Sequence, residues 1–165
     1  MPELGIRGAT EDDVPLILSL IRELANYERL SHEVVASEEV LRDSLFGERP
    51  VAEVLIGDYG GEPAGFALFF HSFSTFLGKP GIYLEDLYVR PGFRGAGLGR
   101  ALLVHLARIA RERGCGRLEW SVLDWNEPAI GFYRRIGASP VGGWTVYRVA
   151  GEALTELAAN AGTAE

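Results

Sequence analysis

The residues with the clearest capacity for chemistry lie in one short stretch, RPGFRGAGLGRAL, which covers residues 90–102. It holds four glycines and three arginines before it becomes apolar. Gly95, Gly97 and Gly99 alternate where a helix is expected to begin, although glycine loses more backbone freedom on ordering than any other residue. A helix N-terminus offers unpaired N–H groups and partial positive charge, and bare backbone lets an anion approach them. We therefore expect this loop to wrap a negatively charged group.

Two familiar phosphate loops do not fit this stretch. A Walker A loop needs Gly, four residues and then Gly-Lys-Ser/Thr, and the sequence contains no such string. A dinucleotide-binding fingerprint needs glycine at its first, third and sixth positions, but counting from Gly95 the sixth position is Arg100. An ordinary glycine-rich turn between a strand and a helix stays open as the alternative.

Hydrophobic periodicity and turn residues predict the elements that must position this loop. A short apolar start near Ile6 precedes a helix that Thr10 caps. The elements expected after that start are, in order, helices to about residue 27 and from Ser37 to Gly47, a hairpin over 52–70 with its turn at Gly60 and Gly61, a strand over 81–89, a helix over 97–113, a strand over 117–123, a helix over 128–136 and a strand over 144–149. This order predicts an α/β protein with a mixed sheet.

Composition limits the class of protein. The 165 residues predict one domain over 1–165, with a core from about residue 6 to 149 and a frayed tail from about 158 to 165. The net charge of −7 argues against a nucleic-acid surface and favours cationic partners. A single cysteine, Cys115, allows no internal disulfide, and the spacing of the three histidines suggests no metal site. The absence of a long apolar run predicts no membrane contact and a cytoplasmic protein.

The pattern Arg94-x-x-Gly97-x-Gly99 resembles the cofactor loop of the GNAT superfamily of acetyl-CoA-dependent N-acetyltransferases. Three further stretches resemble its diamine acetyltransferase branch, which acts on spermidine and spermine or on thialysine: IRELANYE at 21–28, YLEDLYV at 83–89 and WNEPAIGFYRRIGA at 125–138. The resemblance runs from about residue 6 to 149. It implies a single-domain fold with helices on both faces of a mixed central sheet, whose parallel strands over 83–89 and 118–123 splay apart.

The resemblance also implies how acetyl-CoA, the acetyl-donor cosubstrate, would bind. Backbone groups of the strand would run along the pantetheine arm, the glycine loop would wrap the pyrophosphate, and Asn126 would lie on the pantetheine side of the next helix. The residues implied in cofactor binding are Leu87, Tyr88, Val89, Arg94, Gly95, Ala96, Gly97, Leu98, Gly99, Arg100, Asn126 and Tyr133.

Catalysis and substrate binding are implied at a second set of residues. Tyr133 would protonate the departing CoA thiolate, as a general acid; the alternative is a core aromatic, like its helical neighbours. Glu85 would be the base that removes a proton from the substrate amine; the alternative is an acid paired with an arginine. Tyr27, Glu28, Glu85 and Asp86 would contact the substrate. Because adjacent residues of a regular strand face opposite ways, Glu85 and Asp86 cannot both face the same site if this strand is regular.

The predicted function is acetyl transfer from acetyl-CoA to a primary amine of a small cationic substrate, by direct attack. Polyamine-specific members carry acids after the last helix, whereas GASPVGGWTV at 137–146 has none. Thialysine or a similar small amine is therefore as strong a candidate as a polyamine. A non-catalytic acyl-CoA-binding domain and an enzyme acting on a protein or peptide amine are the alternatives. Family habit implies a homodimer.

Overall fold

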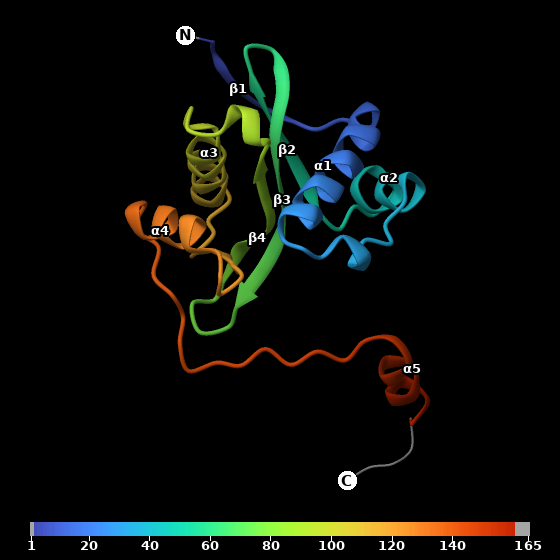
Figure 1. Ribbon diagram of the computed structural model, residues 1–165. Coiled ribbons are helices and arrows are strands. Elements are labelled where there is room, and N and C mark those ends of the chain that lie inside the picture. The colour runs from blue at the N-terminus through green and yellow to red at the C-terminus, as the bar shows by residue number, and fades with distance from the viewer. Residues whose placement is uncertain (1, 161–165) are drawn as a thin grey trace. The chain divides into compact units, whose positions relative to one another are not determined.

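The strands of the protein pair in the order in which they occur along the chain. In the computed structural model, which describes residues 2–160, one sheet has the order β1-β2-β3-β4-β5 (Figure 1). The strands are β1 Leu4–Gly8, β2 Glu53–Tyr59, β3 Glu62–Ser74, β4 Lys79–Val89 and β5 Leu118–Trp120. Neighbours from β1 to β4 are antiparallel, and β4 and β5 are parallel. The predicted mixed sheet is confirmed.

The first helices begin where the sequence predicts. Thr10 and Asp13 form a capping box around the short 3₁₀ turn η1, Glu11–Asp13, and helix α1 follows over Val14–Tyr27. Ser37 caps helix α2, Glu38–Phe46, by accepting a 3.2 Å hydrogen bond from the Val40 N–H. A second 3₁₀ turn, η2 Ser31–Glu33, connects the two helices.

Helices cover both faces of the sheet, as the predicted fold requires (Figure 1). Helices α1 and α2 bury one continuous apolar cluster against β2 and β3, with Ile17, Leu20, Ile56 and Phe66 fully buried in it. Helix α3, Leu98–Glu112, packs on the opposite face through buried leucines at helical spacing, including Leu102 and Leu106. It follows the 3₁₀ turn η3, Pro91–Phe93.

The parallel pair β4 and β5 is joined over a short length only. Residues Ile82 to Leu84 pair with Leu118 to Trp120, and the remaining residues of β4 run on without β5 beside them. Strand β5 is therefore shorter than the 117–123 predicted. The divergence of the two strands agrees with the predicted splay.

The described chain falls into two compact units, one up to Leu123 and one from Asp124 onward. The second unit contains helix α4, Glu127–Arg135, and helix α5, Gly151–Ala159. Asn126 caps α4 through its Oδ1 atom, which accepts a 3.4 Å hydrogen bond from the Ala129 N–H. The predicted helix over 128–136 is confirmed.

One prediction for the second unit is wrong. Residues 144–149 form no strand, although their types favour one. A strand needs a neighbour for its backbone N–H and C=O groups, and the only regular elements of this unit within residues 124–160 are helices. Helix α5 extends to Ala159, and the rest of the tail predicted to fray over 158–165 lies mostly outside the described residues, so that this call stays a prediction.

Within residues 2–160, no helix has both the length and the apolar character needed to traverse a bilayer.

Candidate active site

A β-bulge in strand β4 allows its two acids, Glu85 and Asp86, to line the same hollow. Leu68 of β3 pairs with Asp86 and the next residue, Phe69, pairs with Leu84, so that Glu85 is an extra residue with no partner across the ladder. Cross-strand partners share a face of the sheet. Leu68 packs with the cluster under α1, whereas Phe69 lines the face that carries α3. Leu84 and Asp86 therefore lie on opposite faces, although regular alternation would put them on the same one.

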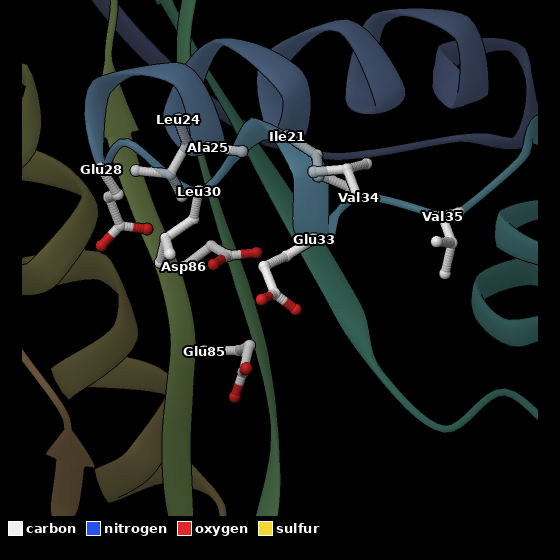
Figure 2. Close-up of a pocket in the computed structure, with 11 residues that line it drawn as sticks. Ile21, Leu24, Ala25, Glu28, Leu30, Glu33, Val34, Val35, Glu85 and Asp86 are labelled. Carbon is white, nitrogen blue, oxygen red and sulfur yellow. The ribbon is translucent and has the colours of Figure 1, made fainter. Parts of the chain in front are cut away.

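Strand β4 is therefore not regular at Glu85 and Asp86, and the geometric objection to a shared site does not apply. Both line one hollow of about 390 Å³ beneath the C-terminal end of α1. Glu28, the C-cap residue that follows α1, and Glu33, from turn η2, line the same hollow. Figure 2 shows the four carboxylates arriving from these three elements, with Asp86 between Glu28 and Glu33 and Glu85 farther along β4.

The hollow is apolar on one side and negatively charged on the other. Ile21, Leu24 and Leu30 form much of the apolar side. No lysine, arginine or histidine occurs among the described residues that line it. This combination suits an organic cation, because the apolar side can contact a hydrocarbon stem while the carboxylates bind an ammonium group.

Crowding of the acids changes their proton affinity. Burial, together with the charges of Glu85 and Glu28, raises the pKa of Asp86 to about 7. Burial also raises the pKa of Glu28, and the charge of Glu85 adds to that effect. Both shifts favour the neutral form of these acids, and a cation bound beside them would favour the charged form.

A second hollow, of about 370 Å³, lies under α3 and does not have this excess of carboxylates over basic residues. Its Arg113 donates two hydrogen bonds to the carboxylate of Glu53, at 2.6 and 2.9 Å, and lies 3.3 Å from the Nε2 atom of His71. Its charged groups are paired with one another. The acidic hollow is therefore the stronger candidate for a site that binds a charged molecule.

The glycine loop lies between β4 and α3. Gly95 and Gly97 have φ angles of +82° and +89°, which only glycine adopts readily, and a Cβ atom built on Gly95 would meet nothing within 4 Å. Gly97 is the N-cap residue of α3, so the first N–H groups of this 15-residue helix have no intrahelical acceptor. The loop thus presents open backbone and a helix N-terminus, as the sequence predicts.

The predicted cofactor residues of the first unit lie in two stretches, at the end of β4 and in the glycine loop that follows it. Leu87, Tyr88 and Val89 are the last residues of β4, beyond the part that pairs with β5. Arg94 and Arg100 are exposed, and the Arg94 Nε donates a 2.9 Å hydrogen bond to the Val89 carbonyl.

Residue Tyr27 is tied to the glycine loop. The guanidinium carbon of Arg94 lies 4.9 Å from the centre of the Tyr27 ring, within the range of a cation–π contact. Tyr27 immediately precedes Glu28 of the acidic hollow. The described structure therefore brings together Glu28, Glu85 and Asp86 in the hollow, and links Tyr27 to the loop beside it.

The neighbouring Arg90 has a structural partner instead. Its guanidinium forms a two-pronged ion pair with Glu23 of α1, at 3.0–3.2 Å, and donates to the Pro63 carbonyl. This contact ties α1 to the end of β4. It fixes the two elements that supply three of the four carboxylates.

Asn126 and Tyr133 belong to the second unit and are placed within it. Asn126 caps α4, as described above. Tyr133 lies in the middle of α4, where its ring centre is 5.6 Å from that of Phe132, and its carbonyl accepts from the Ala138 N–H at 3.0 Å. Their predicted roles beside the cofactor stay predictions.

Sequence reasoning missed Glu33 and the apolar side of the hollow. Glu33 follows the first helix by six residues in a segment with no periodicity, so its type alone marks an ordinary surface acid. The leucines and isoleucine of α1 read as core, because a helical face toward a hollow has the same pattern as one toward a core. Within residues 2–160, no group of three or more His, Cys, Asp or Glu side chains could hold a metal ion.

Comparison with known proteins shows the family to which the chain belongs. The sequence profile described as "Acetyltransferase (GNAT) family" matches residues 18–138, from α1 to just beyond α4. It covers every site residue described above.

Individual relatives are similar over nearly the whole chain. A thialysine N-epsilon-acetyltransferase from Bos taurus is 45% identical over 166 residues, covering 93% of this chain and 96% of that protein. The L-ornithine N5-acetyltransferase NATA1 from Arabidopsis thaliana is 34% identical, covering 92% of this chain and 86% of that protein. Among solved structures, an integron cassette protein from the mobile metagenome of V. cholerae superposes with a TM-score of 0.78 at 30% identity, covering 94% of this chain and 97% of the other.

Proposed function

Because the chain belongs to the GNAT acetyltransferase family and is an N-acetyltransferase, we propose that it acetylates a primary amine of a small cationic molecule, with acetyl-CoA as the donor. The observation that carries the proposal is the acidic hollow. Four carboxylates and an apolar side, with no basic residue among its described lining, match a substrate that combines a positive charge with a short hydrocarbon or thioether stem.

The glycine loop supports acetyl-CoA as the donor. Its open backbone and left-handed glycines leave space for a pyrophosphate against the N-terminus of α3, with Arg94 and Arg100 exposed beside it. Residues Leu87 to Val89 of β4 pair with β3 on one side but extend beyond β5 on the other, so that on this second side they can offer backbone groups to an extended amide chain such as pantetheine. Acetyl-CoA supplies the thioester that the amine attacks.

Substrate class follows from the hollow and from the relatives together. Thialysine and ornithine, which name two relatives, each carry a terminal amine on a short stem. We propose a small amine of this kind in preference to a long polyamine, because the segment over 137–146 carries no acid to hold a distant ammonium group.

Two proton transfers complete the proposed reaction. The ammonium group must lose a proton before its nitrogen can attack, and a carboxylate at the β4 bulge takes it, Glu85 being the base that the family resemblance implies. Tyr133 is proposed to protonate the leaving sulfur.

The domain organisation and the oligomeric state are also proposals. The family profile crosses the boundary at Leu123, so we propose that both units belong to one acetyltransferase domain. We further propose a cytoplasmic homodimer.

The proposed function is tested by measuring release of free CoA from acetyl-CoA in the presence of thialysine, ornithine, lysine and short diamines. At least one of these amines should accelerate CoA release well above the rate with acetyl-CoA alone, and mass spectrometry should find it acetylated. A chain that binds acetyl-CoA but acetylates none of them would contradict the proposal.

A further inference from the structure

Two contacts join the start of the glycine loop to the last turns of α1. The Arg90 guanidinium pairs with both carboxylate oxygens of Glu23, and the Arg94 guanidinium lies over the ring of Tyr27. Glu23 and Tyr27 are one helical turn apart on α1, so their side chains lie on the same face of the helix. Arg90 and Arg94 are the N-cap and C-cap residues of the turn η3. Both ends of this turn therefore contact one face of α1.

Arg90 is the more firmly held of the two arginines. Its backbone N–H donates to the Ala64 carbonyl at 2.8 Å, and its own carbonyl accepts from the Phe93 N–H at 2.9 Å. Its side chain donates to the Pro63 carbonyl at 3.1 Å, in addition to the ion pair. The side chains of Arg90 and Glu23 are 27% and 33% exposed, so solvent screens this pair less than it screens a pair on the open surface. Arg90 therefore connects the start of β3, the glycine loop and α1.

Helix α1, which these arginines contact, leads directly into the acidic hollow. Glu28 follows the last residue of α1, and Ile21 and Leu24 of the same helix form part of the apolar side. The position of α1 relative to β4 thus determines where Glu28 lies with respect to the acids of the β4 bulge. The ion pair of Glu23 with Arg90 fixes this position little more than one helical turn before the hollow.

We infer that Glu23 and Arg90 are positioning residues that couple the two binding sites, so that acetyl-CoA at the glycine loop strengthens the binding of the amine in the acidic hollow. The inference rests on the proposed function and concerns how its two sites influence each other. Neither residue belongs to the groups proposed to contact acetyl-CoA or the amine.

The coupling arises because the two ligands order the same elements. A pyrophosphate against the N-terminus of α3 restricts the backbone of the loop, and through Arg90 it restricts the end of α1 as well. The amine needs this end of α1 in place, because Glu28 supplies one of the carboxylates of the hollow. Once one ligand has restricted these elements, the second loses less conformational entropy on binding. Such coupling is reciprocal, so the amine strengthens the binding of acetyl-CoA by the same factor.

The contact between Tyr27 and Arg94 is less suited to this role. Arg94 is exposed and is one of the residues implied in cofactor binding, so an anion at the loop competes with the Tyr27 ring for its positive charge. The nitrogens of Arg90 are instead directed to Glu23 and to the Pro63 carbonyl. The ion pair can therefore persist when the loop holds its ligand.

Calorimetry measures the coupling directly, with CoA, which has no acetyl group to transfer, and with thialysine and ornithine as the amines. In the wild type, saturating CoA should lower the Kd of at least one of these amines by about fivefold or more. Glu23→Gln should bring this ratio of Kd values to within about twofold of one, because the amide keeps the shape of the side chain but loses the ion pair. Arg90→Gln should do the same. The double variant should lose no more coupling than either single variant, because the pair acts as one unit.

Glu53→Gln is the matched control. Glu53 forms an equally close two-pronged ion pair with Arg113, at 2.6 and 2.9 Å, but this pair joins β2 to the C-cap residue of α3. Thermal unfolding should show a loss of stability in both Glu23→Gln and Glu53→Gln, whereas only Glu23→Gln should lose the coupling. A merely structural role of Glu23 would lower the stability and leave the ratio of Kd values unchanged.

The outcomes distinguish the inference from the proposed function. A wild type that binds CoA and an amine, each with less than about a twofold effect on the other, would overturn the inference and leave the proposed function intact. Full coupling in a folded Glu23→Gln variant would also overturn it. A wild type that binds no CoA, or binds neither amine at any concentration of CoA, would instead contradict the proposed function, and the inference with it.

Discussion

At the scale of single residues, the extra residue in strand β4 determines which carboxylates line the hollow. Glu85 has no cross-strand partner, and its insertion moves Asp86 from one face of the sheet to the other. Four carboxylates from three elements then meet in one hollow. Their mutual repulsion is unfavourable, and a bound cation would offset it.

The proposed acid gives a prediction at this scale. Tyr133→Phe removes one hydroxyl from α4 and should lower kcat by about 10²–10⁴, the usual contribution of a general acid, with little change in the affinity for acetyl-CoA. Steady-state kinetics and calorimetry measure the two quantities. Tyr147→Phe, at a tyrosine that is 91% exposed in the same unit, is the matched control. Wild-type turnover in Tyr133→Phe would remove this residue from the mechanism.

Part of the site could be predicted from the sequence because its residues are adjacent in the chain. The glycine loop and the acids of YLEDLYV each occupy one short stretch, so their types and spacing carry the signal. The bulge could not be predicted, since it arises from the pairing of β4 with β3 and leaves no mark in either strand. Glu33 reaches the hollow only through the path of turn η2.

At the scale of elements, the junction between β4 and α3 is the part most dependent on glycine. Two residues with φ above +80° turn the chain from the strand into the helix, and their lack of side chains keeps the helix N-terminus open. A side chain at such a φ costs about 1–2 kcal/mol, so the backbone conformation by itself favours glycine here.

This junction gives the second prediction of the Discussion. Gly97→Val should weaken acetyl-CoA binding at least tenfold in calorimetry, because the side chain strains the N-cap and occupies space beside the first N–H groups of α3. Gly92→Val is the matched control, since Gly92 lies in the same loop, has an ordinary φ and has no atom near a built Cβ. Thermal unfolding checks that both variants fold. Equal affinities in the two folded variants would discard the loop as the pyrophosphate site.

Elements were predictable where local signals agree with the pairing that the fold provides. Helices α1 and α2 have both periodicity and caps, and β2 and β3 flank a Gly-Gly turn. Residues 144–149 have the composition of a strand but no strand partner in their own unit, so propensity alone gave the wrong answer.

At the scale of the whole molecule, exposed apolar side chains support the proposed homodimer. Phe76 and Phe73, at the end of the β3–β4 hairpin, are 96% and 64% exposed, and Trp144 and Tyr147 are also largely exposed. Light scattering should find twice the chain mass of 18.0 kDa. Phe76→Ser should raise the monomer fraction, whereas Val51→Ser, at another exposed apolar residue, should not. A wild type that is monomeric at micromolar concentration would contradict the dimer.

The overall charge of −7 and the acidic hollow together predict how the length of the substrate affects the rate. Both attract cations, but the hollow holds its acids close together, and the segment over 137–146 supplies no further anion. A second ammonium group a few bonds from the reacting amine should therefore help, and further extension should change kcat/KM by less than about tenfold, or about 1.4 kcal/mol of transition-state binding. The measurement compares a short diamine, thialysine, spermidine and spermine at fixed ionic strength. If spermine exceeded every short amine by well over tenfold, an anion outside the hollow would have to bind its far end, and the preference for short amines would be wrong.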